Sequence, residues 1–505
     1  MFFGWPSKGA NEIKSLDGNI QGPAPLFGDP VNPGGFIKVL LVATNREASP
    51  YPVAPIGALC IASAVQNAGH RVAFLDLGPE TDPQSALTRA IKSGSPDVVA
   101  FSIRNLDNCS MLAPRSYCDE IQVLADLVRN SFDGALVLGG SGFSVSPRGW
   151  MARLQADYGV IGEGERPFVE LLARMENKQP IEDVTGVVTQ ASSNVKLKSI
   201  AAGGTSTDSL GTLPAPAHEL CDYQEYLQRG GFISVQTKRG CPFKCVYCIY
   251  PHLEGRHYRL RPADRVADEI QSVARKTGSD HFFFVDSAFN DPREHALNIC
   301  AELRRHRTSA RWMAYCNPVG FDDELAQVMV EAGCEGVELG LDAATPKMLA
   351  ANCKPFDQQD IRIAMKAAHD ARLPFAAHLL FGGPGETWAD IEEAQEFLDT
   401  CPPANGIFAS FGIRVYEGTA MEEIAIRDGT IPSGHDLFEP AFYVSPALKD
   451  NAAEKLQNVV RRRPEWTSII DWNSPLMRLI QEEMNRRNIR PQWKDIREYG
   501  LRMRR

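Results

Sequence analysis

The sequence predicts an α/β protein with two parallel-sheet domains and a helical C-terminal region. Its 505 residues are too many for one ordinary domain. Two separate stretches alternate strand-like apolar runs with helical patterns, and a segment rich in Gly, Ser, Thr and Pro divides them. The expected parts are an N-terminal extension (1–35), a doubly wound Rossmann-like domain (36–185), a linker (186–230), a partial (β/α)6 barrel (231–425) and a helical C-terminal region (426–505).

The first domain is predicted from five apolar runs, at 37–42, 72–75, 96–102, 135–140 and 158–162, with a helical stretch at 56–68. Strands that alternate with helices favour a doubly wound parallel sheet, whose ligands bind beyond the carboxyl ends of the strands. Small residues lie at those ends, and the clearest are the glycines of 139–142 and 162–165. The most linker-like part of the following segment is 201–206.

The second domain is predicted from six further apolar runs, at 233–237, 281–286, 311–315, 336–341, 375–381 and 408–415. Helical patterns at 263–276, 324–332 and 388–398 fill gaps between them. Six such units fit a partial (β/α) barrel, in which the chemistry gathers at the carboxyl ends of the strands. The region after residue 425 reads as mostly helical and carries no motif.

Composition excludes several classes of partner and site. The net charge of −10 favours neither a nucleic acid nor an anionic membrane surface as partner. There is no signal-peptide pattern and no apolar run long enough to span a membrane, so we expect a cytoplasmic protein without a transmembrane segment. Twelve cysteines in a reducing compartment argue against a disulfide framework, and closely spaced ones point to metal.

The strongest single motif is the loop Cys241-Pro-Phe-Lys-Cys245-Val-Tyr-Cys248, directly after the first strand of the second series. Three thiolates on one short loop can ligate three irons of a [4Fe–4S] cube and leave the fourth iron open. The alternative is structural zinc, which needs four ligands and would recruit His252 or His257.

This loop resembles the signature of the radical S-adenosylmethionine superfamily. The resemblance implies that S-adenosylmethionine binds the open iron and that the aromatic Tyr247 lies against its adenine. It also implies cofactor contacts from the ends of later strands, namely Asp286, Ser287, Glu338, Gly340, Asp342, Gly383 and Pro384. Two alternatives stay open: Thr387 and the glycines before it would also suit a helix start, and Glu338 and Asp342 would also suit ordinary polar positions of a barrel.

The N-terminal domain resembles that of the cobalamin-binding subclass of the superfamily. The segments that carry this resemblance supply the residues implied to contact cobalamin: Pro55, Ile56, Gly57, Arg104, Asn105, Leu106, Gly139, Gly140, Ser141, Gly142, Gly162, Glu163, Gly164 and Glu165. The D-x-H-x-x-G segment that provides a histidine ligand to cobalt in many cobalamin domains is absent. We therefore expect Arg104, Asn105 and Leu106 at the lower face of cobalt. The alternative is a scaffold domain without cobalamin.

Four further residues are candidates for the reaction site. Cys316 ends the third barrel strand, His378 interrupts the apolar fifth strand, and Arg414 and Tyr416 end the sixth. We expect Cys316, His378 and Tyr416 to act in catalysis and Arg414 to bind a cofactor or substrate carboxylate. The commoner role for a lone cysteine or histidine of this kind is a place in the core.

The resemblance implies a radical enzyme that methylates a small-molecule, lipid or natural-product substrate. Its implied cofactors are a [4Fe–4S] cluster, S-adenosylmethionine and cobalamin, and its implied reductant is a flavodoxin or ferredoxin. Within the same resemblance, cyclisation, carbon–carbon coupling or 3-amino-3-carboxypropyl transfer remain alternatives. A non-catalytic cluster or cobalamin sensor is the alternative from another class.

Overall fold

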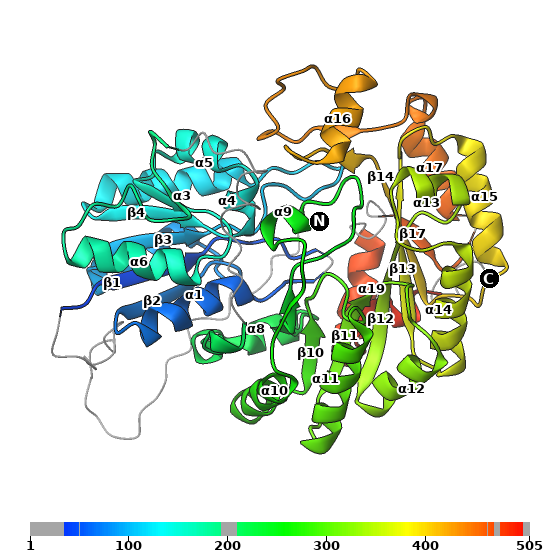
Figure 1. Cartoon of the computed structure of the whole chain (residues 1–505), viewed down its shortest axis with the longest axis horizontal. Coiled ribbons are helices and arrows are strands. Elements are labelled where there is room, and N and C mark those ends of the chain that lie inside the picture. The colour runs from blue at the N-terminus through cyan, green and yellow to red at the C-terminus, as the bar shows by residue number, and fades with distance from the viewer. Residues whose placement is uncertain (1–34, 50, 193–209, 462, 469–474, 498–505) are drawn as a thin grey trace, which may run out of the picture.

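The protein is described from a computed structural model, which covers residues 35–49, 51–192, 210–461, 463–468 and 475–497. Two parallel sheets stand side by side, each with helices, which confirms the predicted fold class (Figure 1). The N-terminal extension before residue 35 and the linker segment 201–206 lie outside the described residues. No helix in the described ranges is both long enough and apolar enough to cross a membrane.

The first sheet contains six strands in the order β2-β1-β3-β4-β5-β6, of which only the last runs antiparallel to its neighbour. The strands are β1 (Lys38–Ala43), β2 (Arg71–Asp76), β3 (Val98–Ser102), β4 (Ala135–Gly139), β5 (Tyr158–Val160) and β6 (Val187–Val188). The strand order reverses between β1 and β3, and this switch point is where doubly wound sheets open a crevice for a ligand. The strand β6 lies within the segment expected as a linker.

Helices cover both faces of this sheet, and the alternation of side chains along β1 explains why. Val39 and Leu41 pack on one face against α1 and α6, while Leu40 and Val42 face α2 and α3 in a second core. The helices are α1 (Ile56–Asn67), α2 (Pro83–Gly94), α3 (Cys118–Ser131), α4 (Ser141–Val145), α5 (Pro147–Leu154) and α6 (Glu165–Glu176).

The second sheet contains seven parallel strands in the order β7-β10-β11-β12-β13-β14-β17. They are β7 (Ile233–Val235), β10 (His281–Phe284), β11 (Arg311–Cys316), β12 (Cys334–Asp342), β13 (Phe375–Phe381), β14 (Gly406–Phe411) and β17 (Trp466–Ser468). The first six match the six predicted runs. The seventh comes from the region expected to be helical, and its three residues are too few to give a strand pattern.

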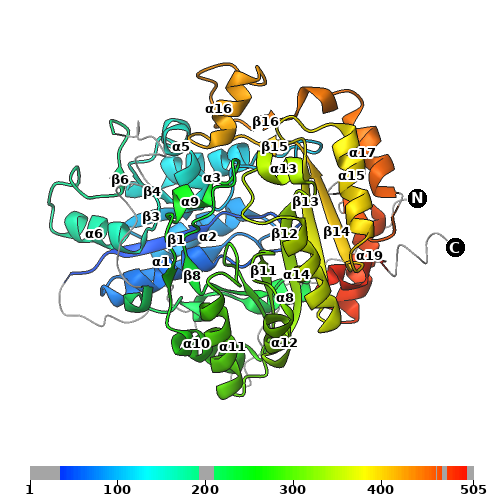
Figure 2. The same ribbon diagram turned by 45° about the vertical axis from the view of Figure 1, so that its right-hand side comes forward.

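Helices flank the outer side of the seven-stranded sheet, while two short strand pairs lie beside it (Figure 2). The strand pairs are β8 (Lys238–Arg239) with β9 (Arg259–Leu260), and β15 (Ile413–Arg414) with β16 (Phe442–Tyr443). The helices of this part are α8 (Tyr223–Gln228), α9 (Tyr250–Leu253), α10 (Ala263–Thr277), α11 (Arg293–Arg305), α12 (Asp323–Glu331), α13 (Pro346–Ala351), α14 (Gln358–Asp370), α15 (Trp388–Asp399), α16 (Ala420–Arg427), α17 (Ala452–Arg461) and α19 (Pro475–Arg486).

A short C-terminal segment closes the amino end of the barrel. The 3-10 turn η4 (Gln492–Asp495) places Trp493 in a small apolar cluster with Phe283, Met313 and Ala376. Asn405, just before β14, donates a hydrogen bond to the carbonyl of Lys494 at 2.8 Å. The carboxyl ends of the strands, where the candidate residues lie, remain on the opposite side.

Candidate functional site

The three predicted cluster cysteines lie on one loop between β8 and α9. Gly240 directly precedes them with φ +93°, and a Cβ there would come within 2.1 Å of the carbonyl oxygen of His257, so only glycine fits. Burial raises the pKa of Cys241, and it raises the pKa of Cys248 to about 12; backbone N–H groups of Phe243 and Tyr250 bond these thiols and oppose that rise.

The loop suits a cluster better than a single zinc ion. Across the described ranges, no three His, Cys, Asp or Glu side chains are grouped as ligands of one metal ion. Zinc needs its ligands around one point, whereas the thiolates of an iron–sulfur cube each bind a different iron. The three cysteines of the loop supply one ligand to each of three irons, whereas a zinc ion would need a fourth ligand.

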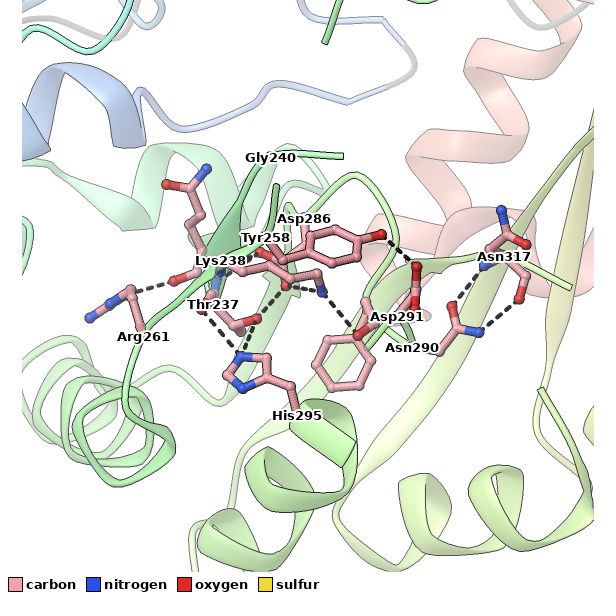
Figure 3. A network of polar contacts seen from close by, with 12 residues as sticks. Thr237, Lys238, Gly240, Tyr258, Arg261, Asp286, Asn290, Asp291, His295 and Asn317 are labelled. Atoms are coloured by element: carbon pink, nitrogen blue, oxygen red, sulfur yellow. Dashed lines mark hydrogen bonds and ion pairs between the residues drawn. The ribbon is translucent and has the colours of Figure 1, made fainter. Parts of the chain in front are cut away.

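A buried polar network lies beneath the cysteine loop and fixes its first residues (Figure 3). One carboxylate oxygen of Asp286 accepts hydrogen bonds from the backbone N–H of Thr237 at 2.8 Å and of Lys238 at 3.2 Å. The other accepts from the Thr237 hydroxyl at 2.5 Å and lies 3.5 Å from the Lys238 ammonium. His295 contacts the same threonine. Asp286 was expected to contact the cofactor, but its side chain is fully buried and holds the strand before the cluster loop instead.

The aromatic residue of the loop meets a lysine that the sequence did not indicate. The hydroxyl of Tyr247 donates to Asp342 at 2.5 Å, and the ammonium of Lys354 lies 2.6 Å from the same carboxylate. Burial acts to lower the pKa of Lys354, but Asp342 and Cys245 outweigh it, so the lysine stays charged beside the cluster loop. Asp342 has φ +58°, a strained conformation that is common at functional sites.

A second group of polar residues lies on the inner face of the barrel. Nε2 of His378 bonds a carboxylate oxygen of Glu338 at 2.8 Å, and the indole N–H of Trp493 donates to the other oxygen at 2.9 Å. The imidazole stacks on Phe408 with ring centres 5.1 Å apart. Its side chain is 36% exposed although it lies on a central strand, so the barrel interior is open beside it. Burial acts to lower the pKa of His378, but Glu338 raises it above 6.5.

Strand alternation decides which residue of β11 reaches this interior. Tyr315 is 39% exposed and lies next to His378, whereas Cys316 is buried in the core between sheet and helices. Burial raises the pKa of Cys316 strongly, which keeps this thiol protonated. The structure thus places the expected catalytic Cys316 away from the interior and brings Tyr315 to it.

The turn after β13 serves mainly as a helix start. The carboxylate of Glu386 accepts the backbone N–H groups of Gly382 at 2.5 Å and Gly383 at 3.0 Å. Thr387 forms a capping box with Asp390 at the first turn of α15, as the structural alternative predicted. Pro384 is half-buried beside this turn. Gly340 leaves space next to β12, since a Cβ there would find no atom closer than 4.0 Å, and Ser287 is exposed after β10.

A cavity of about 470 Å³ opens between the first sheet and the cluster loop. All fourteen residues implied to contact cobalamin line it: Pro55, Ile56, Gly57, Arg104, Asn105, Leu106, Gly139, Gly140, Ser141, Gly142, Gly162, Glu163, Gly164 and Glu165. The opposite wall comes from the second domain and includes Ile249, Tyr250 and Leu253, directly after Cys248. No histidine is among the lining residues that the structure describes, in line with the absent histidine motif.

Glycines shape this cavity for a close backbone approach. A Cβ on Gly57 would meet no atom within 4 Å, so the missing side chain leaves cavity space. Gly140 has φ +94° and lies against the backbone of Ile103, so the turn after β4 packs tightly on the loop that bears Arg104. Open space beside a glycine-rich edge fits a bulky ring system such as a corrin.

Ion pairs join the two domains on both sides of the cavity. Arg239 pairs with Glu165 at 2.5 Å, and Arg414 pairs with Asp107 at 2.8 Å, with all four side chains almost fully buried. Arg414 also donates to the carbonyl oxygens of Val415 and Leu437, so its guanidinium is already engaged by protein. The hydroxyl of Tyr416 lies 3.1 Å from the sulfur of Cys109 at the cavity wall.

Comparisons with known proteins agree with both halves of this site. Residues 235–398 match the Radical SAM superfamily, and residues 44–172 match the B12 binding domain. A tryptophan 2-C-methyltransferase from Streptomyces laurentii is 27% identical over 75% of this chain and 73% of its own length.

Two solved structures share the fold. TsrM from Kitasatospora setae, with cobalamin and a [4Fe–4S] cluster bound, superposes with a TM-score of 0.78 and 23% identity over 93% of this chain and 99% of that one. OxsB, a cobalamin-dependent S-adenosylmethionine radical enzyme, gives a TM-score of 0.73 and 15% identity over 93% of this chain and 71% of that one.

Each matched range lies within the part of the chain that forms one sheet, and the cavity is lined by residues from both parts. The cofactors are therefore a [4Fe–4S] cluster, S-adenosylmethionine and cobalamin. The chain belongs to the cobalamin-binding subclass of the radical S-adenosylmethionine superfamily.

Proposed function

We propose that this chain is a cobalamin-dependent radical S-adenosylmethionine methyltransferase that acts on a small molecule. The observation that carries the proposal is the cavity shared by the two domains. One wall includes the glycine-rich turns of the B12 binding domain, and the other includes Arg239, two residues before Cys241, and Ile249, directly after Cys248. Such an arrangement brings two cofactors to one space, which a scaffold or a sensor with one cofactor would not need.

Each cofactor has residues that fit it. Cys241, Cys245 and Cys248 hold the cluster, while Tyr247, Gly340 and Asp342 lie around the loop where S-adenosylmethionine would bind. The fourteen cavity residues line the space that cobalamin would occupy, with Arg104, Asn105 and Leu106 at its lower face. When bound, cluster and S-adenosylmethionine supply one-electron chemistry and cobalamin carries a methyl group.

His378 is the group we propose to exchange a proton with the substrate. Its Nε2 is held by Glu338, which leaves Nδ1 as the ring nitrogen for this role. Trp493 holds the second oxygen of Glu338, so the carboxylate is fixed and orients the imidazole. Tyr315 and Phe408 border the same interior and would exclude water from it.

We further propose a flavodoxin or ferredoxin as the reductant and the cytoplasm as the compartment. Twelve free thiols, three of them in the cluster loop, need a reducing environment.

The test uses protein purified without oxygen and reconstituted with iron, sulfide and hydroxocobalamin. We expect near-stoichiometric corrin after desalting. With reductant and methyl-labelled S-adenosylmethionine, we expect label to enter a small molecule of a cell extract. The variant in which the three loop cysteines are alanine should keep its corrin and lose transfer. A wild-type protein that keeps iron but binds no corrin would refute the proposal.

A further inference from the structure

Two glutamates of the cobalamin cavity reach across to the cluster domain. Glu163 and Glu165 follow β5, and Glu165 begins helix α6. Arg239 contacts both, with its two terminal nitrogens 3.2 Å from Glu163 and 2.5 Å from Glu165. Both terminal nitrogens of Arg259 donate hydrogen bonds to the carboxylate of Glu163, one of them at 2.9 Å. Two positive and two negative charges thus form one set, which we name the interdomain clamp, and Arg259 also donates to the carbonyl oxygen of Glu254 at 3.1 Å.

The clamp is almost removed from water. The side chains of Arg239, Arg259, Glu163 and Glu165 are 11%, 12%, 13% and 7% exposed. Burial alone would raise the pKa of Glu165, but Arg239 outweighs it and the carboxyl group stays ionised. Buried ion pairs contribute little net stability because desolvation offsets their attraction, although breaking one is costly. Their use is better sought in fixing a geometry.

The geometry that the clamp fixes is that of the cluster loop. Arg239 and Arg259 are paired residues of the two-stranded ribbon β8–β9. Arg239 is two residues before Cys241, and its Nε also donates to Gln236 at 2.9 Å. The backbone N–H of Cys241 donates to Gly255 at 3.0 Å, so the cysteine is held against the segment that leads into β9. A rigid path therefore runs from the turn after β5 to the first cluster ligand.

We propose that the interdomain clamp sets the position of the iron–sulfur cluster relative to the corrin. Its four members are positioning residues that act through the ribbon β8–β9 and the turn after β5. Glu163 and Glu165 serve this role rather than direct corrin contact. The inference rests on the proposed two-cofactor enzyme, because it concerns how two cofactors are spaced.

The experiment compares reconstituted wild type with Glu163→Gln, Arg259→Gln and the double variant. The main measurement is the relaxation of the cob(II)alamin electron paramagnetic resonance signal by the reduced cluster, which depends on the distance between the two spins. We expect the reduced cluster to speed the relaxation of the cob(II)alamin signal less in both single variants than in the wild type. The iron content should stay the same. The affinity for hydroxocobalamin should fall about tenfold in each single variant. The double variant should lose no more than that, because both substitutions break the same contact between Glu163 and Arg259 and their effects do not add.

Two further variants control for general damage. Glu170→Gln removes a carboxylate of α6, the helix that Glu165 begins. The pair of Glu170 with Arg174, at 3.2 Å, lies at the surface, so this variant should leave every measurement unchanged. Arg259→Lys keeps the charge but loses the two-pronged contact, and it should restore part of the spin coupling. This partial restoration separates positioning from a simple loss of folding.

Three outcomes would decide against the clamp. Unchanged relaxation in all clamp variants would overturn it. Weaker corrin binding in Glu163→Gln alone, with Arg259→Gln like the wild type, would mean direct corrin contact. Purely additive losses would mean two independent roles. A wild type that holds iron but no corrin would instead refute the proposed function, and the clamp would then be judged by small-angle scattering, where separated domains of the variants must enlarge the molecule.

Discussion

The substitution Glu386→Gln should make the barrel domain more stable in alkaline solution. Glu386 is 4% exposed, and burial raises its pKa from 4.5 to about 7 although Gly382 and Gly383 donate hydrogen bonds to it. A carboxyl group with a raised pKa in the folded state stabilises that state fully only below its unfolded pKa. This stabilisation is lost as the pH rises through about 7. The loss amounts to roughly 2–3 kcal/mol between pH 5 and pH 8, at about 1.4 kcal/mol for each pKa unit.

Glutamine keeps an oxygen that can accept from the same two N–H groups and never acquires the charge. We therefore expect variant and wild type to differ little at pH 5, and the variant to melt roughly 5–10 °C higher at pH 8. The measurement is the melting temperature of the full-length chain at half-unit pH steps. Glu393→Gln, on the exposed face of α15, the helix that follows Glu386, should show no pH-dependent difference. A constant offset between Glu386→Gln and the wild type from pH 5 to pH 8 would refute the reasoning.

Three further predictions concern the site itself. Alanine at Gly142 would put a Cβ 2.8 Å from backbone of the loop after β3, so it should cost about 1–3 kcal/mol and weaken corrin retention; an unchanged melting temperature would contradict this. Glu338→Gln removes the partner that raises the pKa of His378, and this partnership stabilises the fold only while the imidazole is charged. The variant should be less stable than wild type at pH 5 to 6 and approach it as the pH rises above the raised pKa, which pH-dependent melting would test. Lys354→Met removes the cation that pairs with Asp342. Because that carboxylate is 24% exposed, the free energy of unfolding in urea should fall by about 2–3 kcal/mol, below the range for fully buried pairs. A loss under 1 kcal/mol would mean that solvent replaces the lysine.

Strand positions were predictable because each strand carries its own local pattern. The apolar runs at 135–140 and 375–381 became β4 and β13 almost unchanged. Which face a strand residue occupies depends on its neighbours in the sheet, and here the sequence was less informative. In β11 the register pairs Tyr315 with Glu338, so Tyr315 shares the inner face and Cys316 must point the other way. The expected catalytic thiol thus lies one position along the strand from the residue that faces the barrel interior, and it points to the opposite face.

Partners that are distant in the chain could not be predicted from motifs. Lys354 follows helix α13 and meets Tyr247 across 107 residues, and Trp493 meets Glu338 across 155. A lysine just after a helix or a tryptophan in a short 3-10 turn gives no local signal of such a contact. The glycine-rich turns were informative for the opposite reason, because their backbone forms part of the cavity wall and packs too closely for a side chain at Gly140 and Gly142.

The closure of one end of the barrel determines how a substrate must approach. Trp493 fills the amino end, where a Cβ on Gly336 would come within 3.1 Å of its ring, and its indole fixes Glu338 from that side. Helices cover the outer face of the strands, so the half-exposed His378 is open toward the barrel interior. In Figure 1 the first domain lies beside the seven-stranded sheet, with α9 between the two sheets. A substrate that approaches the imidazole from that side passes between the domains, beside the cavity proposed for cobalamin. The approach path depends on the same interdomain spacing that the clamp holds.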